Sequence, residues 1–162
     1  MKSSDAILKE ENFSVSQDTI DGIPCTIGYM KEFRWSWLGS QLNTFIIIGE
    51  TKEKIDKRFI ESFSKKCFQY SIKNNKGWPR GLQSAVASIA ILQGSIIDDE
   101  AIAFCKKLSK IHWSAFEIPV LYNTDTQRRI RYTIEPIWGS IFFSFLSRVI
   151  DRITNRLQEH KE

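Results

Sequence analysis

Apolar residues recur along this chain in two patterns, one with the spacing of helices and one with the spacing of strands. From Thr51 to about residue 73 the apolar positions lie three or four apart, and lysines and arginines fall opposite them. This spacing predicts an amphipathic helix that Thr51 caps. Its apolar face consists of Ile55, Phe59, Ile60, Phe63, Cys67 and Tyr70. The following KNNKG, with two asparagines and a glycine, predicts where the helix ends.

The stretch SAVASIAILQG at residues 84–94 contains small and β-branched side chains and no charge. A strand with one face in water would alternate apolar and polar residues, so this run predicts a strand covered on both faces. Further strands are predicted at residues 13–15, 25–37, 42–50, 116–123 and 128–136. The second and third of these form an antiparallel hairpin, and the last two are joined by the turn-rich NTDTQ.

Two more helices are predicted in the second half of the chain. One runs from Asp98 to about residue 113, with three acids at its positive N-terminal end and His112 on its apolar face at the other end. The other runs from Pro136 to about residue 158 and carries a wide apolar stripe flanked by arginines.

This order of elements predicts an α+β fold. We expect a mixed, mainly antiparallel sheet of five or six strands with three helices, built as a two-layer or an incomplete three-layer sandwich. Residues 84–121 predict one βαβ crossover. Because 162 residues suit one core, residues 12–162 are expected to form a single domain, preceded by a flexible lead-in over residues 1–11.

Composition excludes several classes of protein. With 42% hydrophobic and 26% charged residues the chain is not of the disordered type. Its apolar runs are shorter than the roughly 18 residues of a membrane helix, and its polar N-terminus is unlike a secretory signal, so we expect a cytoplasmic protein without membrane contact. The cysteines at positions 25, 67 and 105 form no CxxC pair, which predicts buried free thiols.

Recognisable catalytic motifs are missing from the sequence. Two histidines, His112 and His160, give little material for a nucleophile and base, and no phosphate-binding glycine motif occurs. The acids at positions 98–100 are sequential and point in different directions, as helix caps do. We therefore expect no catalytic set, no metal and no cofactor. A carboxylate pair assembled across space from Glu32, Glu117, Asp125 or Glu135 stays open.

Positive charge is concentrated in two segments. Residues 51–81 carry nine Lys or Arg against three acids, and residues 128–162 carry seven against four. Within the first segment GWPRG is a proline-stiffened turn, which either presents Trp78 and Arg80 to a ligand or only reverses the chain. The predicted ligand-binding residues are Lys76, Trp78, Arg80, Gln83, Arg129 and Arg131.

Three functions are consistent with these features. The first is a non-catalytic interaction or regulatory domain that contacts a protein partner or forms a homodimer, and the lack of a catalytic set favours it. The alternative is a binding module for an anionic ligand or nucleic acid that uses the turn 76–83 and the arginine-bearing hairpin. The third is an enzyme acting on a small anionic substrate, which requires Arg80, Gln83 and a carboxylate such as Glu117 to converge.

Overall fold

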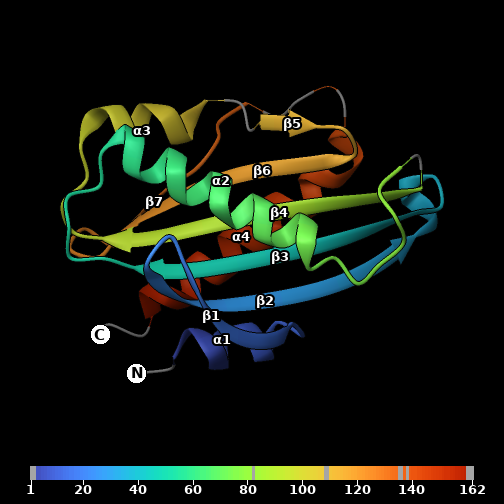
Figure 1. Cartoon of the computed structure of the whole chain (residues 1–162), viewed down its shortest axis with the longest axis horizontal. Coiled ribbons are helices and arrows are strands. Elements are labelled where there is room, and N and C mark those ends of the chain that lie inside the picture. The colour runs from blue at the N-terminus through green and yellow to red at the C-terminus, as the bar shows by residue number, and fades with distance from the viewer. Residues whose placement is uncertain (1–2, 82, 108–109, 135–136, 138, 160–162) are drawn as a thin grey trace.

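The computed structural model describes residues 3–81, 83–107, 110–134, 137 and 139–159. Its strands are β1 (Ser14–Ile20), β2 (Ile23–Arg34), β3 (Ser40–Glu50), β4 (Ser84–Gly94), β5 (Lys110–His112), β6 (Ala115–Asn123) and β7 (Arg128–Ile130). Its helices are α1 (Ser4–Glu10), α2 (Lys57–Lys73), α3 (Asp99–Lys106) and α4 (Ser140–Glu159), with a 3-10 turn η1 (Trp35–Trp37). The α+β content and the mixed sheet are confirmed (Figure 1). The expected five or six strands and three helices are wrong, because the described residues form seven strands and four α-helices.

The strands form one open sheet in the order β1-β2-β3-β4-β6-β5, and β7 also pairs with β6. The pairs β3–β4 and β4–β6 are parallel, and the remaining pairs are antiparallel. The expected parallel crossover from β4 to β6 is present. A second crossover joins β3 to β4 through α2. The described residues thus contain two crossovers, whereas the sequence predicted one. In both cases the chain crosses over between neighbouring parallel strands, since β3, β4 and β6 lie side by side and run in the same direction.

Strand β4 lies between two helical layers, and all eleven of its residues are buried. Ile89 and Ile91 pack in a cluster with α1 and α4, whereas Ala90 and Leu92 pack in a second cluster with α2 and α3. The prediction of a strand covered on both faces is confirmed, and the molecule has three layers (Figure 1). None of the described helices combines the length and the apolar character needed to span a membrane.

Helix α2 begins later than its apolar pattern predicts. The cap is Asp56, whose carboxylate accepts a hydrogen bond from the backbone N–H of Phe59 at 2.8 Å, and not Thr51. Ile55 precedes the helix and forms a β-bridge with Ile97. This bridge links the segment that follows β3 to the segment that follows β4.

Two hairpins were missed because the outer strand of each, β1 or β5, is largely exposed. The pair β1–β2 turns at Asp21 and Gly22, which both have positive φ, at 53° and 76°. The helix predicted from Asp98 to about residue 113 ends at Lys106, and His112 lies instead on β5. A tight turn over residues 113–114, in which Ser114 has φ 48°, pairs β5 with the start of β6.

Helix α1 occupies the segment that we expected to be a lead-in. Ile7 and Leu8 are buried in the core cluster that also contains α4. Glu11, which follows α1, forms ion pairs with Arg152 at 3.2 Å and Arg156 at 2.8 Å. Two of the arginines that flank the apolar stripe of α4 therefore connect α4 to the end of α1.

Replacing Ile89, which is buried, with alanine is expected to leave a cavity. The free energy of unfolding should fall by about 2–5 kcal/mol as a result. Ile96 is exposed, outside the core. The same replacement there should change the free energy of unfolding by less than about 0.5 kcal/mol. Urea denaturation followed by circular dichroism measures both values, and equal losses at the two positions would contradict the burial of β4.

Candidate functional site

The turn between α2 and β4 is held in place by the side-chain amides of two residues of β3, Gln41 and Asn43. Trp78 donates its backbone N–H to Gln41 Oε1 at 2.9 Å, and Asn43 donates to Ser84 Oγ at 3.3 Å. Ser84 in turn donates its hydroxyl to the backbone carbonyl of Trp78 at 3.0 Å. The Tyr29 hydroxyl donates to Asn43 Oδ1 at 2.8 Å, and burial raises the pKa of Tyr29, which keeps this proton in place. Because Asn43 is fully buried, these bonds fix the turn firmly.

Gly77 is the position where this turn approaches the two amides most closely. A β-carbon built on Gly77 would collide with Oε1 of Gln41 and Oδ1 of Asn43, and would lie 2.6 Å from Cγ of Asn43. Real atoms do not approach so closely, so a larger residue would push the turn away from β3. The same test at Gly81 finds open space.

The predicted residues of the turn lie together at one end of the sheet. Trp78 is about half exposed and its ring contacts that of Phe33. Arg80 donates to the backbone carbonyl of Trp113 at 3.1 Å, and so bridges to the β5–β6 hairpin. Gln83 uses its backbone carbonyl to accept from the N–H of Gln41, while its side chain is exposed. Lys76 is exposed in the same turn.

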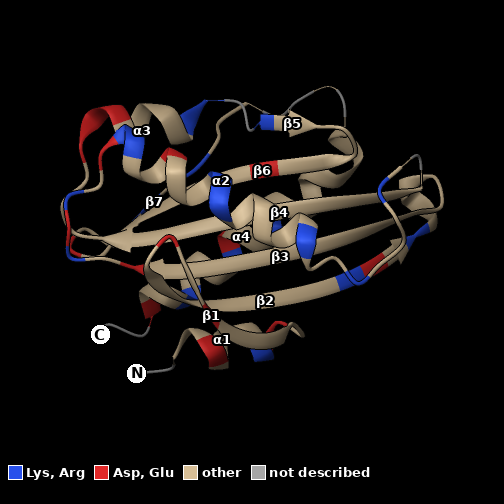
Figure 2. Cartoon of the chain, in the orientation of Figure 1, with Lys and Arg blue, Asp and Glu red and all other residues tan. Residues whose placement is uncertain are grey.

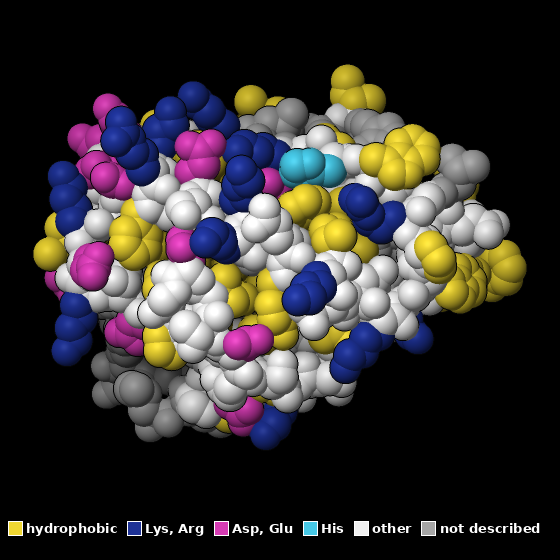
Figure 3. All heavy atoms as spheres, in the orientation of Figure 1, with side chains coloured by type: hydrophobic (Ala, Val, Ile, Leu, Met, Phe, Trp, Pro, Cys, Tyr) yellow, Lys and Arg dark blue, Asp and Glu magenta, His cyan; other side chains and the backbone are white. Residues whose placement is uncertain are grey.

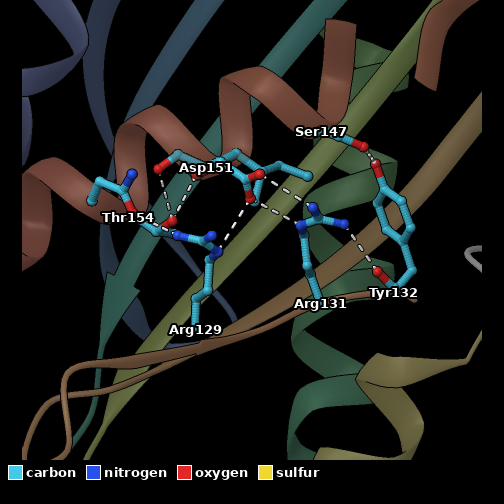
Figure 4. Close-up of polar contacts among 8 residues, drawn as sticks. Arg129, Arg131, Tyr132, Ser147, Asp151 and Thr154 are labelled. Carbon is cyan, nitrogen blue, oxygen red and sulfur yellow. Dashed lines mark hydrogen bonds and ion pairs between the residues drawn. The ribbon is translucent and has the colours of Figure 1, made fainter. Parts of the chain in front are cut away.

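Arg129 and Arg131 lie elsewhere, where β7 meets α4 (Figure 4). Arg131 binds the carboxylate of Asp151 with two nitrogens, at 3.0 and 3.2 Å, and Arg129 approaches the same carboxylate at 3.1 Å. Next to them Tyr132 and Ser147 share a hydrogen bond of 2.6 Å. The structure does not bring these arginines to the turn 76–83, and their charge is used to join β7 to α4.

The end of the molecule that carries the turn exposes several large apolar side chains. We call this set the apolar end surface: Phe33, Trp35, Leu38, Trp78, Trp113, Ile137 and Ile141. They come from η1 and its flanks, the turn, the tip of the β5–β6 hairpin, the approach to α4 and the first turn of α4. Trp35 is 84% exposed, Leu38 85% and Trp113 68%. Yellow side chains gather at this end in the right part of Figure 3.

A hollow of about 390 Å³ lies within this surface. Leu38, Trp113 and Ile137 contribute to its walls, and Gly81 and Ser84 from the turn also line it. It opens where β3, β4 and β6 begin, beside residues that the Asn43 network holds in place. The walls of the hollow are mainly apolar, and the turn that lines one side of it is held by the Asn43 network.

A second polar group lies on the face that α2 covers, and its centre is a buried carboxylate. Glu117 of β6 is 3% exposed and accepts a hydrogen bond from the hydroxyl of Ser64, on α2, at 3.2 Å. Its other oxygen lies 3.1 Å from Nε2 of His112, whose ring stacks on Phe68 with centroids 4.2 Å apart. The arrangement holds the imidazole rigidly at the protein surface.

The three thiols differ from reactive cysteines in their surroundings. Burial raises the pKa of Cys25 to about 11 and of Cys105 to about 12, and it raises that of Cys67 further. A thiol with a raised pKa is a poor nucleophile at neutral pH. Among the described residues no three His, Cys, Asp or Glu side chains are grouped as metal ligands would be.

Comparison of this chain with protein-family models, with curated proteins and with solved structures gave no match. The function must therefore be inferred from the chemistry of these surfaces.

Several residues of both sites were missed in the sequence. Gln41 and Asn43 were missed, although polar residues within a buried strand were an available signal. Glu117, the only charge in β6, was named as a candidate carboxylate, but its partners Ser64 and His112 were not foreseen. Ser64 had no such signal. Trp113 was assigned to a helix end, and only the β5–β6 pairing shows that it projects beside the turn.

Replacing Gly77 with alanine is expected to make the new methyl group collide with the amides of Gln41 and Asn43. The free energy of unfolding should fall by about 1–3 kcal/mol through this overpacking. Gly81→Ala is the matched control and should change it little, since its methyl group enters open space. Chemical denaturation of both variants makes the comparison. If both were as stable as the parent protein, the turn would not be anchored as described.

Proposed function

We propose that this chain is a non-catalytic interaction domain that holds an acidic protein partner on its apolar end surface. The observation that carries the proposal is the exposure of Leu38, Trp113 and Ile137 around one hollow, with the exposed Trp35 on the same end surface. Folded monomers rarely expose contiguous apolar patches of more than a few hundred Å² without a binding role. Full burial of a side chain such as Leu38 contributes about 1.5–3 kcal/mol, so a partner that covers this end gains substantial free energy.

The residue types support a protein interface. Tryptophan and arginine are enriched among the residues that dominate binding energies. Trp78 and Arg80 lie in one turn, whose backbone is held at Trp78, and the side chain of Arg80 is held by the backbone carbonyl of Trp113. The backbone that carries these residues is therefore positioned before the partner arrives. Groups that are already positioned lose little conformational entropy on binding.

The charges around the surface select the partner. Lys76 and Arg80 carry positive charge in the turn, and Lys31 lies on β2 two residues before Phe33. Glu32 is bonded to Arg34 at 2.9 Å and so does not offset them. Figure 2 shows more blue than red on the ribbon toward this end. A partner with apolar side chains flanked by acids complements such a rim.

The same charges disfavour a second copy of the chain. In a two-fold dimer the same patch meets itself, so the lysines and arginines of both rims would face one another. The hollow also disfavours a flat lipid surface, because its walls fit around a side chain of a partner.

The test uses the variant Trp35→Ala plus Leu38→Ala and the matched control Ile96→Ala, whose isoleucine is exposed outside this surface. Proteins captured from cell extract by the parent chain are purified and titrated by calorimetry against all three proteins. We expect one acidic partner whose affinity falls about 30-fold or more in the double variant, as loss of dominant contacts does, and stays unchanged in the control.

Three results would contradict the proposal. The first is that no purified protein binds, or that it binds the double variant as tightly as the parent. The second is a concentration-dependent dimer, detected by light scattering, that the double variant abolishes. The third is binding to anionic vesicles that depends on Trp35 and Leu38.

A further inference from the structure

A groove follows the exposed side of α2 next to β5. We call it the basic groove and define it by Arg58, Lys65, Phe68, Lys73, Arg80, Lys110 and His112. It consists of two hollows of about 570 and 460 Å³. Both hollows are lined by Phe68, Gln69 and His112, so they adjoin and form one continuous depression.

The charge along this groove is mainly positive. Five of its lining residues are lysines or arginines, and its acids are Glu61 and the buried Glu117. Lys110 pairs with Glu61 at 3.0 Å and holds the pKa of that carboxyl below its usual value, so both groups are charged and offset each other. Among the ion pairs of the described residues, none includes Arg58 or Lys65, although Lys65 also helps to lower the pKa of Glu61 from a longer distance. Their charges are available to a ligand.

Flat rings lie between these cations. His112 stacks on Phe68 and is fixed by Glu117, which Ser64 fixes in turn. The buried carboxylate thus orients a ring at the surface. Trp113, largely exposed, lies beside His112 in the second hollow. Cations beside fixed aromatic faces are the features by which proteins hold unpaired bases and their phosphates.

The length of the groove indicates a chain and not a single small ion. Arg58 and Lys73 lie near opposite ends of α2, fifteen residues apart. Since an α-helix rises about 1.5 Å per residue, this separation corresponds to about 22 Å. A mononucleotide or free phosphate would occupy one of the two hollows and leave cations unused. A duplex would keep its base faces stacked and out of reach of the rings.

We propose that the basic groove binds single-stranded nucleic acid. Phosphates lie along Arg58, Lys65 and Lys73, and bases stack at His112 and Trp113. Contacts of this kind read no particular sequence, so affinity depends on salt and on single-strandedness more than on base identity. This binding is independent of the partner proposed for the apolar end surface, apart from Arg80 and Trp113, which border both.

Fluorescence anisotropy with labelled oligouridine and oligothymidine of about ten nucleotides, and with a duplex of the same length, tests the proposal. The parent protein should bind both single strands more tightly than the duplex and lose affinity steeply as salt rises. The variant Arg58→Gln plus Lys65→Gln should reduce the slope of log K against log salt by about 1.4, which corresponds to two phosphate contacts at about 0.7 each.

The charge-matched control is Lys52→Gln plus Lys66→Gln, which removes two lysines outside the groove lining, and its slope should equal that of the parent. Trp113→Ala should weaken binding about five-fold or more through lost stacking, whereas Trp35→Ala, also an exposed tryptophan, should not. Preference for RNA over DNA would show that the 2′-hydroxyl is also recognised, and the groove would still be the site.

The proposal is overturned if neither single strand binds at about 50 mM salt. It is also overturned if the duplex binds as tightly as the single strands, or if the two charge variants lose affinity equally. Binding of free phosphate or of a mononucleotide as tight as that of the oligonucleotides would overturn it too, because it would show a small-ligand pocket. Circular dichroism of each variant confirms that the fold is intact before affinities are compared.

Discussion

The side chain of Asn43 lies fully buried where β3, the start of β4 and the turn 77–81 meet, and its hydrogen bonds set the geometry of this end of the molecule. A buried amide must be bonded on both its oxygen and its nitrogen, and here Tyr29 and Ser84 meet that need. Ser84 and Gln41 in turn hold the backbone of Trp78. The course of the backbone at Trp78 and Arg80 is thus set by the hydrogen bonds that the buried amides of the sheet require.

Both proposed binding regions lie away from the edge where α/β sheets most often bind ligands. That edge is at the carboxyl ends of the parallel strands. Here it is closed for β3 and β4, because Thr51 donates to the carbonyl of Gln93 and the bridge between Ile55 and Ile97 lies just beyond. The amino ends of β3, β4 and β6 are open instead. The apolar end surface lies there, and the basic groove extends from it along α2.

Sequence patterns were sufficient where burial alone decides the structure. The uncharged run at residues 84–94 predicts a strand covered on both faces, and the three-to-four spacing that follows Thr51 predicts α2, although the helix starts only at Lys57. The patterns failed where a strand exists only because it pairs with another strand. The example is β5, whose three residues are all exposed and provide no buried apolar face. As a result, the sequence patterns placed His112 and Trp113 at the end of a helix, whereas the structure places both residues in the basic groove. The partners of Arg129 and Arg131 were equally hidden, because Asp151 lies twenty residues beyond Arg131 in the chain.

The account rests most directly on the apolar end surface being covered in the cell by a protein partner. Site-specific photo-crosslinking from position 38, compared with position 96, tests this in living cells, because Leu38 is 85% exposed within the surface and Ile96 is exposed outside it. The account predicts one acidic protein joined to the chain from position 38 and not from position 96. Crosslinks from position 38 only to a second copy of the chain, or the same products from both positions, would contradict it.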